Sequence, residues 1–450
     1  MPISTNSLLL IMDEDRYLAD LVLAIVGVLM LRRIRRRRRQ IQRQAPQPQP
    51  PVRRRLWAQP WLLRREVQGD YDNLLWELHR EDHKGFKSFI RISTGLFEEM
   101  IAKIEPKVKK QDTRLRKALP VGLKLAVTLR FLSTGNTYSS LGFSFRTSTS
   151  AISRFVPLVC DALYEAYSPE FLKCPKTPEE WKEVANEFRR KWNYHHCCGA
   201  LDGKHVPIKK PDHQGTLYYN YKKFHSIILM ALADAKYRFL YVDVGAEGGA
   251  GDAGTWIKST LCRGIEKEKV GFPTTDLHLP HDNQDIPYHI IGDDAFALKT
   301  WLMKPYAHLS QVHHERIFNY RLSRARRVVE NAFGVLQMRW RVFGSPIGLN
   351  PKTVRTVTLC ACVMHNLLLV HHPPRPQHLD REDYEGNFIP GEWRDTENLM
   401  ERLMAAYARN PTRRAKAQRD YLALYFCSRV GAVPWQERIV YPRGRPAHVL

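Results

Sequence analysis

The first part of the chain that can form a core carries apolar residues at helical spacing. Between about residues 71 and 167, apolar side chains recur three and four positions apart, which is the period of an amphipathic helix. The groups are Leu74, Leu75 and Leu78, then Phe97, Met100, Ile101 and Ile104, then Leu123, Ala126, Val127 and Phe131. The pattern predicts an all-helical region, which we assign to residues 53–170.

The end of this region predicts a helix-turn-helix outline. A helix through Phe131 meets Gly135, a typical helix stop, and a short helix around Leu141 precedes a third helix with Ser148 as a candidate N-cap. In such motifs the start of the last helix contacts DNA bases, although ordinary packing of a helical bundle explains the pattern equally well. The candidate DNA-binding residues are Arg146, Ser148, Thr149, Ser153 and Arg154.

Short apolar runs rich in β-branched and aromatic residues dominate after a connector at residues 171–197, which contains one helix. They predict a mixed α/β domain over residues 198–366, opened by three strands in an antiparallel meander. A C-terminal extension, residues 367–450, is polar and proline-bearing, and we expect it to be peripheral. Strands are expected at 199–208, 226–233, 238–245 and 288–293, and helices at 254–262, 296–303 and 319–343.

Charge is concentrated near the N-terminus. The chain has 70 Lys and Arg against 46 Asp and Glu, a net charge of +24, and thirteen arginines lie between Arg32 and Arg65 without an acidic residue among them. Such a run is typical of a nuclear-import signal, a nucleic-acid-binding arm or a merely solvated segment. With the Pro/Gln linker at 45–51 it forms an N-terminal arm, residues 1–52. We expect DNA as a partner and a location in the nucleus, with the cytoplasm as a second location.

An apolar segment precedes the arginines. Leu21–Leu31 would reach about 16 Å as a helix, against a hydrocarbon core of about 30 Å, so it is too short to span a membrane. We expect a helix that packs on a partner, and a membrane anchor is the less favoured alternative. The eight cysteines are sparse and unevenly spaced, which favours a reducing compartment over a secreted disulfide framework.

Three carboxylates suggest chemistry when they are taken together. Asp202 and Asp293 each follow an apolar run where a strand is expected to end, and Glu330 lies beside the apolar stripe of the long helix. Each has an ordinary explanation alone: a strand end for the aspartates, and for Glu330 an ion pair with Arg326 or Arg327. If they converge, they supply the anionic oxygen ligands that Mg²⁺ or Mn²⁺ prefers, and such metals promote phosphodiester cleavage.

The chain resembles the transposase-derived nucleases of the PIF/Harbinger group from Arg53 to Asn366. The resemblance rests on motifs in one order: Cys198–His205, Tyr219–Lys222 with His225 and Ser226, Asp243–Gly245 with Asp252–Gly254, Gly292–Phe296 with Met303–Tyr306, and Phe318–Gly334. It implies an α/β RNase H-like DDE catalytic domain, a mixed sheet flanked by helices, preceded by the all-α helix-turn-helix-like region.

The resemblance also implies roles for individual residues. Asp202, Asp293 and Glu330 would be the catalytic, metal-binding triad, and Asp252 either a further metal ligand or a residue that orders its loop. Asp294 competes with Asp293, and only the family pattern favours the latter. The group is associated with a separate Myb/SANT-like DNA-binding protein, which the resemblance implies as a partner.

Other candidate sites are weaker. His195–Cys198 and Cys360–His365 lack the paired spacing of structural zinc sites, so core packing is the better interpretation. Lys204 is a candidate phosphate contact because, if the strand continues, alternation puts it on the same face as Asp202. Tyr218, Tyr219 and Tyr221 could stack on bases or be ordinary strand aromatics.

The sequence therefore predicts a divalent-metal-dependent nuclease that hydrolyses DNA and derives from a Harbinger-type transposase. The alternative is a transposon-derived DNA-binding or adaptor protein whose acidic site no longer turns over. The target sequence, strand transfer and oligomeric state cannot be read from the sequence.

Overall fold

The computed structural model describes residues 26–38, 59–114, 117–212, 214–250, 252–274, 277–395, 400–402 and 411–442. The chain divides into two compact units, residues 1–59 and residues 60–450, and each is described by itself. In the first unit, residues 26–38 form a helix with exposed side chains, which includes the first arginines of the N-terminal arm. The rest of the arginine arm and the Pro/Gln linker lie outside the described residues.

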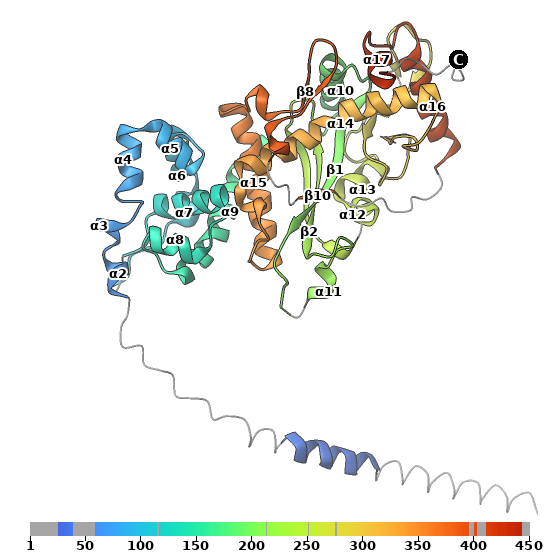
Figure 1. The fold of residues 1–450 in the computed structure, drawn as a ribbon. Helices are drawn as coiled ribbons and strands as arrows, with labels where there is room; N and C mark the ends of the chain where they lie inside the picture. Colours follow the sequence, from blue (N-terminus) through green and yellow to red (C-terminus); the bar gives the residue numbers. More distant parts are fainter. Residues whose placement is uncertain are drawn as a thin grey trace, which may run out of the picture. The chain divides into compact units, whose positions relative to one another are not determined.

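The second unit begins with the predicted helical region (Figure 1). The turn after α7 needs Gly135, because its φ is +71° and a Cβ would lie 3.0 Å from the carbonyl oxygen of Arg341. The Ser148 hydroxyl accepts a hydrogen bond from the amide of Ala151 and caps α9, which confirms the predicted N-cap. The helices are α2 (Pro60–Leu63), α3 (Arg65–Gln68), α4 (Leu74–Glu81), α5 (His83–Ile90), α6 (Thr94–Val108), α7 (Val121–Thr134), α8 (Tyr138–Ser144) and α9 (Thr149–Phe171).

A mixed sheet forms the centre of the second half of this unit. Its strand order is β3-β2-β1-β6-β7, in which β1, β2 and β3 are antiparallel neighbours and β6 and β7 run parallel to β1. The predicted meander is therefore confirmed. The strands are β1 (Cys197–Pro207), β2 (Ser226–Ala233), β3 (Phe239–Glu247), β6 (His289–Ile291) and β7 (Leu302–Met303), and β10 (Glu401–Arg402) pairs with β1.

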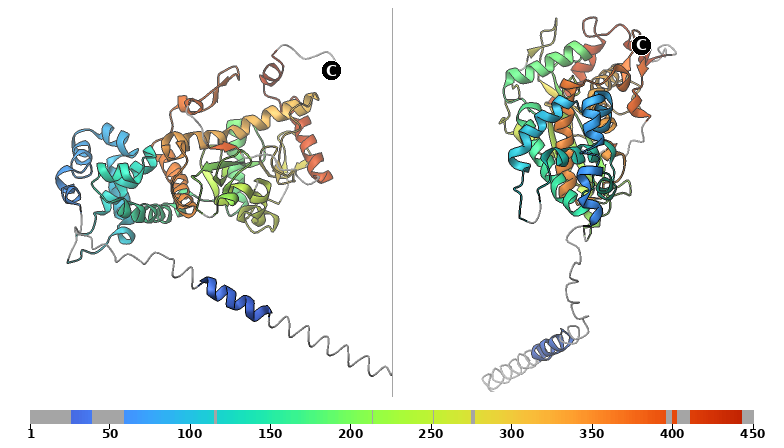
Figure 2. Two further views of the ribbon diagram at one scale, coloured as in Figure 1. Left: turned by 60° about the horizontal axis from the view of Figure 1, so that its bottom comes forward. Right: turned by 90° about the vertical axis from the view of Figure 1, so that its left-hand side faces the viewer.

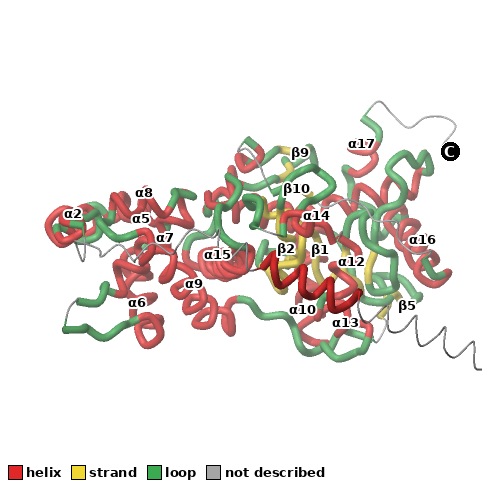
Figure 3. The backbone as a smooth tube through the Cα atoms, turned by 90° about the horizontal axis from the view of Figure 1, so that it is seen from below, coloured by secondary structure: helices red, strands yellow, loops and turns green. Residues whose placement is uncertain are grey.

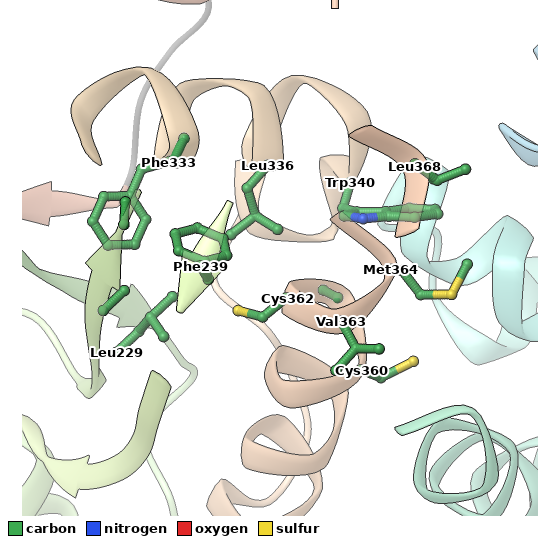
Figure 4. Close-up of a cluster of buried hydrophobic side chains, with 14 of the residues drawn as sticks. Leu229, Phe239, Phe333, Leu336, Trp340, Cys360, Cys362, Val363, Met364 and Leu368 are labelled. Atoms are coloured by element: carbon green, nitrogen blue, oxygen red, sulfur yellow. The ribbon is translucent and has the colours of Figure 1, made fainter. Parts of the chain in front are cut away.

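Helices cover both faces of this sheet (Figure 3). On one face Leu229 and Phe239 pack against Phe333 and Leu336 of α14 and Cys362 of α15 (Figure 4). The other face packs against α10, α12 and α13. Because both faces are covered, every residue of β1 and β2 is buried. The helices are α10 (Pro178–Trp192), α11 (Gly215–Tyr218), α12 (Asp252–Lys258), α13 (Thr260–Glu266), α14 (His313–Arg339) and α15 (Pro351–His371).

One helical prediction is wrong. Residues 296–303 were expected to form a helix, but they run irregularly and end in β7. Phe296, Leu298 and Met303 are buried, so the apolar side chains of this segment leave water without forming a helix. Leu302 pairs with Ile290 at the edge of the sheet. A short apolar run fits a helix or a strand, and here the available sheet edge decides.

The helical region and the sheet share one hydrophobic core. Helix α9 lies beside α15 (Figure 1 and Figure 2), and the buried residues of both belong to a single cluster that reaches the sheet. Helix α15 is long and apolar enough to cross a membrane, with a mean hydropathy of 1.5, but 67% of that window is buried inside the protein. Its apolar character is that of a core helix.

The expectation of a peripheral C-terminal extension is also wrong. Helix α16 packs on α14, with Leu422 and Phe426 fully buried, and the buried Arg321 of α14 donates hydrogen bonds to the carbonyl of Gly431 (2.9 Å) and to Gln436 (3.0 Å). Residues 376–394, which we call the C-terminal strap, also lie on α14. The remaining elements are η1 (Gly248–Ala250), β4 (Leu277–His278), β5 (Asp285–Ile286), η2 (Arg341–Gly344), η3 (Pro376–His378), β8 (Arg381–Glu382), β9 (Phe388–Ile389), η4 (Glu392–Arg394), α16 (Arg413–Cys427) and α17 (Gln436–Val440).

Candidate active site

Asp202 lies in the middle of β1 and is almost completely buried. The expectation that it ends the strand is wrong, because β1 continues to Pro207 and pairs with β2 along this whole stretch. The alternation of the strand puts Lys204 on the same face, as predicted, and the Lys204 Nζ lies 3.6 Å from Oδ2 of Asp202. This face is covered by α14, since the same ammonium group lies 5.7 Å from the ring centroid of Phe333.

Asp293 follows the end of β6, as predicted, and the amide of Ala295 donates a hydrogen bond to its Oδ1 (3.0 Å). Burial and the neighbouring Asp202 carboxylate raise the pKa of Asp293 to about 6, although Arg326 opposes the shift. Ala200 of β1 pairs with Ile291 of β6, and each aspartate lies two residues after its member of this pair, so the two aspartates lie at neighbouring positions. Asp294 is exposed, whereas Asp293 is partly buried.

Glu330 of α14 is held by two arginines. Arg326, one turn earlier on the helix, donates a hydrogen bond from Nη2 to Oε1 of Glu330 (2.9 Å), and the same Nη2 lies 4.0 Å from Oδ1 of Asp202. Arg394 of the C-terminal strap reaches Oε2 of Glu330 at 3.5 Å. Although burial opposes it, the carboxylates of Asp202 and Glu330 raise the pKa of Arg326, so its guanidinium stays charged between them.

Arg394 is itself anchored by a buried carboxylate. Asp380, whose side chain is fully buried, accepts two hydrogen bonds from Arg394, at 2.9 and 2.6 Å. The side chain of Asn331, next to Glu330 on α14, bonds the backbone N–H (2.8 Å) and carbonyl (3.0 Å) of Asp380 and accepts from the indole of Trp393 (3.0 Å). These contacts hold the C-terminal strap over Glu330.

The sequence did not point to Asp380, Asn331 or Arg394. The sequence held one signal for them. Asn331 is polar and Gly334 has no side chain, yet both lie beside the apolar stripe of a long helix. A Cβ on Gly334 would lie 2.4 Å from the ring of Trp393, so the glycine makes room for the C-terminal strap.

The two aspartates fit a hard cation, and the third carboxylate has other partners. Oδ2 of Asp202 is buried and accepts no hydrogen bond among the described residues, which leaves an anionic oxygen available as a ligand. Across the described part of the chain, no three His, Cys, Asp or Glu side chains lie close enough to hold a metal ion. Glu330 would have to exchange its arginine partners to join Asp202 and Asp293. Helix α12 begins at Asp252, but the side chain lies outside the described residues, so its predicted metal role stays a prediction.

The predicted DNA-binding residues lie around the start of α9. Thr149, Ser153 and Arg154 are exposed there, and Arg154 donates from Nε to the carbonyl of Ser150 (2.9 Å). Arg146 is already engaged, since it donates to the carbonyls of Trp61 and Gln68, both at 3.1 Å. The role of these residues and of the Ser148 cap in DNA binding stays a prediction.

The histidine and cysteine motifs lie in packed surroundings. His196 stacks on Tyr288 and its Nδ1 lies 2.9 Å from the carbonyl oxygen of Ile286, while Nε2 of the buried His365 lies 2.9 Å from the carbonyl oxygen of Tyr237. Within the described residues, none of the eight cysteines is joined to another by a disulfide bond.

Comparison with known proteins finds a family match for one domain and several relatives. Residues 201–366 match the family described as DDE superfamily endonuclease. The chain is 25% identical to the Arabidopsis thaliana protein named "Protein ALP1-like" over 297 residues, which covers 64% of this chain and 71% of that protein. It is 26% identical to human "Putative nuclease HARBI1" over 264 residues, or 58% of this chain and 71% of the human protein.

No solved structure matches the chain. The family match includes Asp202, Asp293 and Glu330, and it ends at the residue where the sequence resemblance ended. Residues 201–366 therefore match the DDE superfamily endonuclease family, which agrees with the resemblance that the motifs indicated, and the relatives named above are 25 to 26% identical to the chain.

Proposed function

We propose that the protein is a divalent-metal-dependent nuclease that hydrolyses DNA phosphodiester bonds and derives from a Harbinger-type transposase. The observation that carries this proposal is the pair Asp202 and Asp293 on the sheet of a strongly basic chain. They are two neighbouring carboxylates, and the buried Oδ2 of Asp202 accepts no hydrogen bond among the described residues. The β3-β2-β1 meander extended by parallel strands supports the RNase H-like fold that the resemblance implies.

Asp202 and Asp293 would hold Mg²⁺ or Mn²⁺, with Glu330 as the third ligand and Asp252 as a further candidate. When bound, such a cation activates water and stabilises the departing oxygen of a phosphodiester. Lys204 lies beside Asp202 and would balance its charge, and it is our candidate for a contact with a phosphate oxygen. The basic helical region and the N-terminal arm would supply affinity for the DNA backbone.

Nuclear location and a Myb/SANT-like partner complete the proposal. The arginine run at residues 32–39 supports nuclear import, with the cytoplasm as a second location. The partner rests on the resemblance to the PIF/Harbinger group. Co-purification of a Myb/SANT-like protein with the tagged chain from nuclear extract would support it, and a chain that enters the nucleus and binds DNA without such a protein would remove the need for it.

Plasmid nicking tests the catalytic proposal. The purified chain should nick DNA with Mg²⁺ or Mn²⁺ and not with EDTA, and Asp202→Asn or Glu330→Gln should abolish nicking because each removes one anionic ligand. Asp294→Asn is the matched control, since it alters an exposed neighbour of Asp293 and should leave nicking intact. Asp252→Asn tests the role of the remaining acid. If the variant loses metal affinity while its thermal stability is unchanged, Asp252 is a metal ligand. Nicking in EDTA, or by the Asp202 variant, would place the active site elsewhere.

A silent DNA-binding or adaptor protein is the second candidate. The contacts of Glu330 with Arg326 and Arg394 favour it, because guanidinium groups already compensate the carboxylate that a metal would need. Wild-type protein that binds DNA but stays inert with both metals would make this the better assignment.

A further inference from the structure

A cavity away from the acidic site is lined by cationic side chains. It has a volume of about 500 Å³ and lies where α5, the end of α14, η2 and the residues after α15 meet. No Asp or Glu lines it. We call it the cation pocket, defined by Lys84, Lys87, Arg91, Arg339, Arg341 and Arg375.

These six cations have no acidic partners among the residues that the structure describes. Within the described residues, none of the six forms an ion pair with a carboxylate; on the same wall, His378 pairs with Glu392 at 3.5 Å. Burial and the neighbouring Arg341 and Arg130 lower the pKa of Arg91, and burial together with Arg91 lowers the pKa of Arg339 to about 10. Like charges gathered without compensation destabilise one another, so an anion would relieve the repulsion.

Three residues that line the pocket also carry buried donors that find no acceptor in the described part of the chain. They are Nε of Arg91, Nη1 of Arg339 and Nε2 of His372. Lys87 Nζ lies 3.0 Å from Nδ1 of His372 and can only donate, so Nδ1 accepts and the ring proton lies on Nε2. Arg339 donates from Nη2 to the carbonyl of His372 (2.8 Å), which orients its guanidinium. A buried donor without an acceptor is costly, and such donors often mark a site for a missing group.

The chemistry of the walls selects the ligand. Six cationic side chains and no carboxylate disfavour a bound cation, and guanidinium groups match phosphate oxygens in bidentate geometry. The volume lies in the range of small-molecule sites, about 300 to 1,000 Å³, so there is room for more than one phosphate group. We propose that the cation pocket binds an anion that carries several phosphate groups.

Such a ligand would join two parts of the protein. Lys84, Lys87 and Arg91 belong to the helical region, whereas Arg339 ends the helix that carries Glu330. Arg339 lies nine positions after Glu330 on α14, a rise of about 14 Å, so the pocket is distinct from the acidic site. Two sources of the ligand share this chemistry: a free polyphosphate, or phosphate groups of a DNA backbone.

Thermal unfolding and titration calorimetry of the full chain in EDTA test the site. Tripolyphosphate should raise the melting temperature and bind saturably, whereas sulfate at equal ionic strength should not. Lys84→Gln combined with Arg375→Gln changes two exposed side chains without opening the core, and should weaken tripolyphosphate binding about tenfold or more. The matched control, Lys267→Gln with Lys269→Gln, removes the same charge from exposed positions elsewhere and should leave the affinity unchanged.

Competition identifies the source. A short DNA duplex that displaces tripolyphosphate, and that binds less tightly to the Lys84/Arg375 variant, assigns the pocket to the nucleic-acid backbone. A duplex that binds without displacing it assigns the pocket to a free polyphosphate. Absence of saturable tripolyphosphate binding, or equal weakening by the control pair, overturns the proposal, because bulk charge would then explain the interaction.

Discussion

Removing the charge of Asp293 should stabilise the metal-free protein. Asn has nearly the same shape as Asp but cannot ionise, so Asp293→Asn isolates the electrostatic cost of the carboxylate beside Asp202. Burial and Asp202 raise the pKa of Asp293 from 3.8 to about 6 against the opposing effect of Arg326. A shift of about two units corresponds to about 3 kcal/mol, and this is the upper value expected for the gain in unfolding free energy.

The sign follows from proton binding. Because the folded-state pKa of Asp293 lies above its unfolded value, the folded protein binds more protons between pH 3.8 and about 6, and stability falls as the pH rises through that window. Asp293→Asn lacks this loss. The variant and the wild type should therefore differ by about 3 kcal/mol at about pH 7 to 8 and converge near pH 4.

Urea unfolding followed by circular dichroism, in EDTA at several pH values, measures the difference. Asp294→Asn is the matched control, because the neighbouring exposed carboxylate should contribute almost nothing. Added Mn²⁺ should stabilise the wild type but not Asp293→Asn, since a ligand stabilises only the state that binds it. A variant that is less stable than the wild type at about pH 8, or a difference independent of pH, would refute the placement of Asp293 beside Asp202.

The other predictions concern the C-terminal strap and DNA binding. Arg394→Gln should lower the unfolding free energy by about 3 kcal/mol, because it leaves the buried carboxylate of Asp380 without its charged partner. The control Arg381→Gln changes an exposed side chain in the same strap and should have little effect. Equal urea midpoints for the two variants would contradict this prediction. Arg154→Ala should reduce the preference between DNA sequences, measured by competition binding, and leave the melting temperature unchanged. Arg146→Ala should lower the melting temperature, measured by thermal unfolding, because it loses two hydrogen bonds to backbone carbonyls. The reverse result would exchange the roles of the two arginines. Deleting residues 1–52 should weaken binding to all DNA sequences. It should also flatten the slope of log K against log salt concentration, which is about −0.9 per phosphate contact. If the slope is unchanged and the truncated protein stays in the cytoplasm of transfected cells, the arm serves nuclear import alone.

Some features of the protein follow from a few neighbouring residues. Gly135 ends α7 and Ser148 caps α9 because the conformation or hydrogen bond that each requires is local. The alternation of β1 places Asp202 and Lys204 on one face for the same reason. The family, too, could be recognised from short motifs in a given order, and the family match confirms it.

Other features depend on residues far apart in the chain. The sequence suggested an ion pair between Arg326 and Glu330, four residues apart, but not that the same guanidinium lies near Asp202. Residues 296–303 form an irregular segment that ends in β7, because β7 pairs with β6 at the edge of the sheet. Such contacts cannot be read from local periodicity, since short apolar runs fit more than one element until packing selects one.

The surroundings of the acidic site were set by packing in the same way. The C-terminal strap looked peripheral because its sequence is polar and rich in proline, yet Asn331 and Asp380 fasten it to α14, so that Arg394 reaches Glu330. The cation pocket likewise brings together Lys84 and Arg375, which are far apart in the sequence. The sequence alone thus determined the helical and strand segments with local signals and the motifs that match the family model. The tertiary structure decided which charges meet, because burial and long-range packing choose the partners of a charged side chain.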